Sequence, residues 1–167
     1  MKASRAGLTA PAFAAHRAAR AHVLESFMIK TLLAADGSEH GEHVAAFLVR
    51  LAEAGTPLEV VLLNVQPEVV DWQTHGLAQE SMHAQREYLG REATESVRRL
   101  LDAAGLRYEL HVEMGDPADT IVRFAKEQRC DWIVMGTRGM GALEAFALGS
   151  VARKVIHLAE VPVTLMK

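Results

Sequence analysis

Small residues are concentrated in one stretch of the chain, "VMGTRGMGALEAFALGSVARKVI", which contains Gly136, Gly139, Gly141, Gly149 and Ser150. Glycine lowers stability inside a helix or strand, so such a cluster indicates a chain bent through positive φ or a ligand lying against the main chain. Exposed backbone amides, together with a serine hydroxyl at a helix start, can bind the oxygens of a phosphate group. The spacing alone leaves open the alternative that the glycines only shape a turn.

The elements that must position this cluster follow from the pattern of apolar residues. Five short apolar runs are typical of strands buried on both faces of a parallel sheet: "MIKTLLAAD", "LEVVLLNV", "RYELHVEM", "DWIVMG" and "PVTLMK". Helical patterns separate them over residues 39–54, 77–104, 117–128 and 151–159. Strict alternation of strand and helix with right-handed crossovers predicts a doubly wound α/β sandwich.

Turn chemistry supports these element boundaries. Asp116 followed by Pro117 is typical of a helix start, because the aspartate can cap the helix and the proline already has a helical φ. Gly105 follows "RRLLDAA", where a left-handed residue would end the long helix. In doubly wound sheets ligands bind beyond the carboxyl ends of the strands where the winding reverses. We expect this position between the first and fourth strands, which end at Asp36 and Gly136.

The segment "GTRGMGALEAFALGS" matches G-x2-G-x9-G-[S/T], the signature of the nucleotide-binding branch of the universal stress proteins. The chain resembles that family across residues 28–167, through "KTLLAADGSEHGEHVAAF", "LEVVLLNV", "GDPADTIVRFAKEQRCDWIVMG" and "SVARKVIHLAEVPVTLMK". The resemblance implies a three-layer α/β sandwich of the adenine nucleotide alpha hydrolase-like class. Its five-stranded parallel sheet would have the order 3-2-1-4-5.

The resemblance also implies a site for ATP or AMP, with or without Mg²⁺. The positions that match the family's nucleoside contacts are Ala34, Asp36, Val65, Met135 and Gly136. Those that match its phosphate loop are Gly139, Gly149, Ser150 and Val151. A carboxylate can accept hydrogen bonds from ribose hydroxyls while backbone amides donate to phosphate, which agrees with this division.

Three residues affect how well the nucleotide site of the family fits this sequence. Ala34 stands where related proteins have proline or valine, which implies a looser wall beside the adenine. Glu144 places an acid in the connecting loop, and we expect it to face solvent because a carboxylate near phosphate would weaken binding. Arg138 is expected to lie in solvent, with a phosphate contact as the alternative.

Other chemistries lack their motifs. No Gly-Lys pair occurs, which excludes a P-loop NTPase. The segment after the first strand, "DGSEHGEH", lacks the G-x-G-x-x-G pattern of dinucleotide-binding enzymes. It also lacks the S-G-G-x-D-S motif of ATP pyrophosphatases. His40 and His43 are three residues apart on a predicted helix but have no third ligand nearby, so we expect no metal site. No catalytic residue is predicted. The alternatives to a nucleotide-binding regulatory module are a non-nucleotide interaction module of the same fold and a slow ATPase.

Composition limits the partners. The chain has 167 residues, half of them hydrophobic, which is enough for one domain. We expect this domain over residues 28–167. Residues 1–27 would be an extension, with Met28 as a candidate start. The extension is basic, the remainder is acidic within a net charge of -3, and aromatics are 5%, a pattern that disfavours nucleic-acid binding. No apolar run approaches the roughly 18 residues of a membrane span.

The last features concern location and assembly. A single cysteine, Cys130, fits a reducing compartment, so we expect a cytoplasmic protein. The final strand, "VPVTLMK", would lie at a sheet edge with apolar residues and unpaired backbone groups. We therefore expect a homodimer joined through this strand, with a monomer whose edge is covered by another segment as the alternative.

Overall fold

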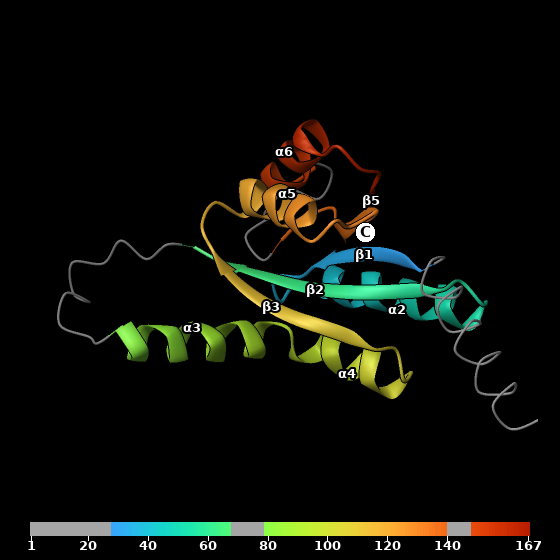
Figure 1. Cartoon of the computed structure of the whole chain (residues 1–167), viewed down its shortest axis with the longest axis horizontal. Coiled ribbons are helices and arrows are strands. Elements are labelled where there is room, and N and C mark those ends of the chain that lie inside the picture. Colours follow the sequence, from blue (N-terminus) through green and yellow to red (C-terminus); the bar gives the residue numbers. More distant parts are fainter. Residues whose placement is uncertain (1–27, 68–78, 140–147) are drawn as a thin grey trace, which may run out of the picture.

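The computed structural model describes residues 28–67, 79–139 and 148–167 and contains one parallel five-stranded sheet with the order β3-β2-β1-β4-β5 (Figure 1). The strands are β1 (Ile29–Ala34), β2 (Leu58–Gln66), β3 (Tyr108–Met114), β4 (Trp132–Gly136) and β5 (Val163–Met166). The helices are α2 (Glu39–Glu53), α3 (Gln79–Ala93), α4 (Glu95–Ala103), α5 (Pro117–Glu127) and α6 (Ser150–Leu158). The predicted strand order is confirmed.

Helices cover both faces of the sheet, as Figure 1 shows. Consecutive side chains of a strand point to opposite faces, so Leu32 packs in the core beneath α5 and α6 while Leu33 packs in the core beneath α2 and α4. Both leucines are fully buried. The continuous apolar runs of the sequence therefore reflect strands buried on two sides, and the predicted three-layer sandwich is confirmed.

Two predicted helix boundaries agree with the structure. Gly105 has a φ of +65°, and Leu106 donates its N–H to the Leu101 carbonyl at 3.0 Å, as expected after a helix that ends in a left-handed residue. At the start of α5, the Asp116 carboxylate accepts the Asp119 N–H at 3.1 Å, with Pro117 as the first helical residue. These caps fix where β3 begins and where α5 leaves the sheet.

The single helix predicted over residues 77–104 is wrong in the described part, which contains α3 and α4 meeting at Thr94. Thr94 is fully buried, and its hydroxyl donates to the Gly90 carbonyl at 2.8 Å beside the ordinary backbone bond to the same oxygen. Such bonding to a residue four positions earlier bends a helix. The start of the predicted helix, residues 77 and 78, lies outside the described residues.

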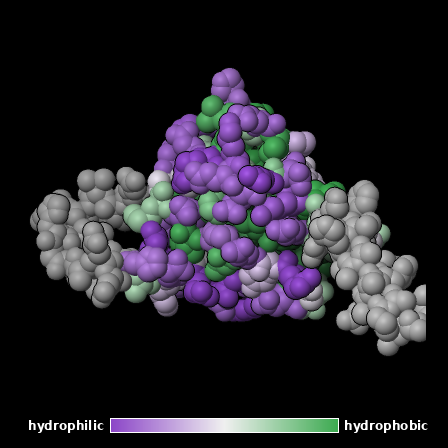
Figure 2. Space-filling view, viewed as in Figure 1, coloured by the Kyte–Doolittle hydropathy of each residue, from purple (hydrophilic) through white to green (hydrophobic). Residues whose placement is uncertain are grey.

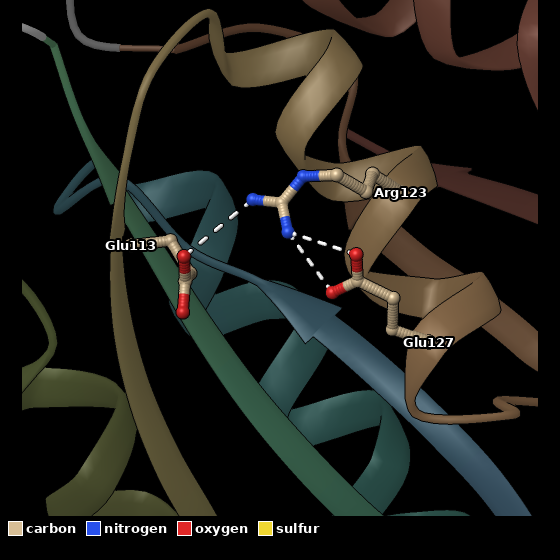
Figure 3. Close-up of polar contacts among 3 residues, drawn as sticks. All are labelled: Glu113, Arg123 and Glu127. Carbon is tan, nitrogen blue, oxygen red and sulfur yellow. Dashed lines mark hydrogen bonds and ion pairs between the residues drawn. The ribbon is translucent and has the colours of Figure 1, made fainter.

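Surface ion pairs connect α5 to its own last turn and to β3. Arg123 donates to Glu127 at 2.9 and 3.1 Å and reaches Glu113 of β3 at 3.5 Å (Figure 3). The Glu127 carboxylate, helped by Glu113, raises the pKa of Arg123 above its usual value. Because these groups are exposed, the pairs contribute little to stability, but they place opposite charges next to each other on this face.

Hydrophilic side chains cover most of the molecular face seen in Figure 2, with apolar residues between them. Among the described residues that are exposed and apolar, Tyr88 and Leu89 lie on α3, whereas Ile156 and Leu158 lie on α6. Within the described part of the chain, no helix is both long and apolar enough to cross a membrane.

Candidate functional site

A cavity of about 490 Å³ opens beyond the carboxyl ends of β1, β2 and β4. This is the place where the winding of the sheet reverses, because β1 is flanked by β2 on one side and β4 on the other. The volume falls within the usual range for small-molecule sites. Every residue that the sequence assigned to the nucleotide lines this cavity: Ala34, Asp36, Val65, Met135, Gly136, Gly139, Gly149, Ser150 and Val151.

The cavity also has walls that the motif did not indicate. Leu63 of β2 and Ile121 of α5 add apolar surface, and Pro117 lines the cavity at the start of α5. The available signal was the apolar face of α5, which predicts contact with the sheet but not which residues reach past the strand ends. Together with Val65 and Met135, these residues give the cavity apolar lining, as is usual for small-molecule sites.

Asp36 supplies a carboxylate to the cavity. Its Oδ1 accepts the Ser38 N–H at 3.1 Å, which holds the side chain over the turn that leads into α2. A side chain at Gly139 would collide with Asp36 Oδ2. The absence of a side chain at Gly139 thus allows the segment after β4 to approach the carboxylate that follows β1.

Gly136 closes the floor of the cavity against α2. A Cβ at this position would lie 2.6 Å from the Cβ of His40, closer than real side chains approach. Gly136 therefore lets the first turn of α2 pack directly on the end of β4. His40 itself does not line the cavity, and its buried Nδ1 has no hydrogen-bond partner among the described residues.

Gly149, in the predicted phosphate loop, is the N-cap residue of α6. Its N–H donates to the Thr137 carbonyl at 2.9 Å, so this amide is already used within the protein. The first bond of α6 runs from the Arg153 N–H to the Gly149 carbonyl at 3.0 Å. The amides of Ser150, Val151 and Ala152 have no intrahelical acceptor, because they belong to the first turn. Donors for an anion are therefore those of the helix start, with Gly149 as their support.

Charges around the cavity are mixed. Arg138 and Asp36 line it, whereas Glu144 lies outside the described residues. At the start of α5, Asp116 accepts the Asp119 N–H and a 3.1 Å contact from Lys154, and these interactions hold the pKa of Asp116 below its usual value. Lys154 of α6 thereby offsets the negative charge of α5 near the cavity.

The two histidines considered as ligands have other surroundings. The rings of His40 and His43 lie edge to face with centroids 6.3 Å apart, and His43 Nδ1 lies 2.8 Å from the Lys167 carbonyl. Over residues 28–67, 79–139 and 148–167, no group of three His, Cys, Asp or Glu side chains could hold a metal ion. Glu113 and Glu127 share Arg123 on the surface (Figure 3), and neither glutamate is among the residues that line the cavity.

The fold and the cavity together define a doubly wound α/β protein with a cavity at its topological switch point. Comparison with known sequences gives the family. The sequence model described as the universal stress protein family matches residues 28–167, and the chain belongs to that family.

Individual relatives agree with this assignment. The universal stress protein MJ0531 of Methanocaldococcus jannaschii is 34% identical over 151 residues, which cover 86% of this chain and 84% of the relative. The solved structure of MJ0577, a universal stress protein of the same organism, has a TM-score of 0.70 at 25% identity and covers 84% of this chain and 96% of its own. The universal stress protein of Archaeoglobus fulgidus, solved in complex with dAMP, has a TM-score of 0.56 at 26% identity, with 84% and 98% coverage.

Proposed function

We propose that this protein is a regulatory module of the stress response that binds an adenine nucleotide, ATP or AMP, in the cavity beyond β1, β2 and β4. The observation that carries the proposal is the meeting of all the motif positions in one cavity, although they come from three separate parts of the sequence. The Archaeoglobus fulgidus relative in complex with dAMP supports the choice of an adenine nucleotide.

The chemistry of the walls suits the three parts of a nucleotide. Leu63, Val65 and Met135 form an apolar surface for the base. Asp36 can accept hydrogen bonds from ribose hydroxyls. The start of α6, where Ser150 lines the cavity, offers backbone amides and the positive end of a helix dipole to phosphate oxygens.

Mg²⁺ and hydrolysis have weaker support. Among the described residues that line the cavity, Asp36 is the only carboxylate, so phosphate oxygens and water would supply most ligands of an accompanying Mg²⁺. The described lining also contains no histidine that could act as a general base. Binding rather than turnover is therefore the proposed activity.

Assembly and location are part of the same proposal. We propose a homodimer joined through β5, which ends the sheet order next to β4. Cys130 is buried and forms no disulfide, which suits a reducing compartment such as the cytoplasm. Residues 1–27 lie outside the described residues, and we propose that they are an extension to the domain of residues 28–167.

A Gly149→Val variant tests the site. A Cβ at Gly149 would lie 3.2 Å from the Thr137 carbonyl oxygen, so a branched side chain must displace either the loop or the start of α6. We expect AMP and ATP affinity, measured by calorimetry, to fall at least about ten-fold, since a lost hydrogen bond to a charged group costs about 1.5–3 kcal/mol. Native mass spectrometry of wild type purified from cells should show a retained adenine nucleotide.

The matched control is Thr56→Val, which places valine just before β2, at the amino ends of the strands and so at the opposite end of the sheet from the cavity. Its nucleotide affinity should equal that of the wild type. Equal AMP and ATP affinity of Gly149→Val and wild type would show that the nucleotide does not bind in this cavity. No measurable binding of AMP or ATP by the wild type would favour the non-nucleotide interaction module.

A further inference from the structure

A buried polar side chain lies next to the proposed site without lining it. Asn64 of β2 is 1% exposed and stands between Leu63 and Val65, which both face the cavity. Since side chains alternate along a strand, Asn64 points to the other face of the sheet, toward the α2 and α4 side. A carboxamide is costly to bury there unless its donors and acceptor are paired.

The pairing of Asn64 connects it to the end of β1. The Asn64 Nδ2 donates to the Ala35 carbonyl at 2.8 Å, and the Asn64 Oδ1 accepts the Gln66 Nε2 at 2.7 Å. The Ala35 N–H donates to the Leu63 carbonyl at 3.0 Å, just past the last residue of β1. Beyond the Ala35 N–H, the next bond between these two segments comes from a side chain, because the Asn64 amide bonds to the Ala35 carbonyl.

The bond to the Ala35 carbonyl also constrains the next residue of the chain, Asp36. The Ala35 carbonyl belongs to the same planar peptide unit as the Asp36 N–H, so holding the carbonyl also sets the direction in which the Asp36 Cα continues. Asp36 then bonds to the Ser38 N–H and approaches Gly139. One buried amide on the far face of the sheet thus holds the peptide unit from which Asp36 continues.

We propose that Asn64 is a positioning residue for ribose recognition, acting through the Ala35 carbonyl on Asp36. This inference depends on the proposed function, because it assigns Asp36 to the ribose of a bound nucleotide. Asn64 does not touch the ligand. Its effect is to keep the Asp36 carboxylate where ribose hydroxyls can donate to it.

The test compares two ligands that differ only in the ribose hydroxyls, AMP and 2′,3′-dideoxy-AMP. Asn64→Leu has a similar shape but cannot donate to the Ala35 carbonyl. We expect its affinity for AMP, measured by calorimetry, to fall about ten-fold, the scale of a lost hydrogen bond to a charged group. The affinity for 2′,3′-dideoxy-AMP should fall less than about three-fold, because that ligand never used the Asp36 contact. The wild-type preference for AMP should therefore largely disappear.

Two variants guard against a trivial loss of folding. Asn64→Thr keeps a polar, β-branched residue suited to a strand, but its hydroxyl is shorter than the asparagine side chain, and it should show the same selective loss. Leu62→Val is the matched control. Leu62 is fully buried two residues earlier on the same face of β2, so this change loosens the same core but keeps the Asn64 side chain that bonds to the Ala35 carbonyl. It should lower the affinities for both ligands equally, or leave them unchanged.

The outcomes separate this inference from the proposed function. Wild type that binds AMP, combined with Asn64 variants that weaken both ligands by the same factor, would overturn the positioning role and leave the nucleotide site intact. Wild type that binds neither ligand would overturn the proposed function and this inference with it. A selective loss of the AMP preference in either Asn64 variant, absent in Leu62→Val, supports the role of Asn64.

Discussion

Each of three cavity glycines has a different neighbour that explains it. Gly139 lies against the Asp36 carboxylate, Gly136 against the Cβ of His40, and Gly149 against the Thr137 carbonyl. None of the three has a positive φ in the structure. Close approach rather than backbone conformation is therefore the physical reason for glycine at these positions.

A residue far from the cavity gives a prediction about pH. Burial raises the pKa of the Cys130 thiol to about 11, compared with 9.0 without burial. As the pH rises, the thiol therefore ionises earlier in the unfolded chain than in the folded protein. The contribution of Cys130 to the free energy of unfolding is thus complete below pH 9 and is lost as the pH rises toward 11. We expect the free energy of unfolding of the wild type to fall more steeply over this range than that of Cys130→Ala, by up to about 2–3 kcal/mol.

Urea unfolding of both proteins at several pH values, with a reductant present, measures this difference. The Cys130→Ala variant cancels the contribution of other groups that titrate at high pH, such as Tyr108, whose pKa is also raised by burial. Parallel stability curves between pH 9 and 11 would show that the Cys130 thiol ionises as easily in the folded protein as in the unfolded chain.

At the scale of elements, the contact between α3 and β3 depends on one glycine. A Cβ at Gly90 would collide with the side chain of Val112. Alanine favours a helix by about 1 kcal/mol over glycine, yet overpacking costs about 1–3 kcal/mol, so packing should win. We expect Gly90→Ala to lower the free energy of unfolding by about 1–2 kcal/mol in urea titrations.

The background of Val112→Ala provides the control. Removal of the two Cγ atoms of Val112 relieves the closest contacts, so adding Gly90→Ala there should cost less than half of what it costs in the wild type. An equal cost in both backgrounds would assign the effect to the backbone of α3 instead of its packing on β3.

At the scale of the whole molecule, the proposed homodimer can be tested on exposed residues. Val163 and Leu165 of β5 pack on the core of their own chain, so charging them would also damage the monomer. Ile156, on α6 beside β5, is 49% exposed and a better probe. We expect the wild type to scatter light as a dimer at micromolar concentration and Ile156→Lys to shift toward a monomer, because a two-fold pairing of β5 would bring the α6 surfaces near each other.

Tyr88→Lys is the matched control for this experiment. Tyr88 is 65% exposed on α3, across the sheet from α6, so its replacement should leave the dimer intact. Dissociation by Tyr88→Lys and not by Ile156→Lys would place the interface on the α3 face. A wild type that is monomeric at micromolar concentration would contradict the proposed homodimer.

The sequence by itself determined the strands and the order of the elements, except that it joined α3 and α4 into one helix. Buried parallel strands must be continuously apolar, and caps such as Asp116 and Gly105 carry local chemistry that needs no tertiary context. The family resemblance then supplied the strand order and the residues of the cavity. Local spacing alone indicates only that the strand ends and the loops after them meet, as they do wherever a doubly wound sheet forms.

Only the tertiary structure decided the features that depend on burial or on neighbours distant in sequence. The break between α3 and α4 falls at Thr94, which is fully buried and bonds through its hydroxyl to Gly90, and the helical pattern of residues 77–104 contained no signal strong enough to predict it. The role of Asn64 arises from a bond to a carbonyl 29 residues away. The use of the Gly149 amide by Thr137 likewise depends on how the loop closes. The hydrogen bonds of Asn64 and Gly149 join atoms that no periodicity relates, so the folded chain alone specifies them.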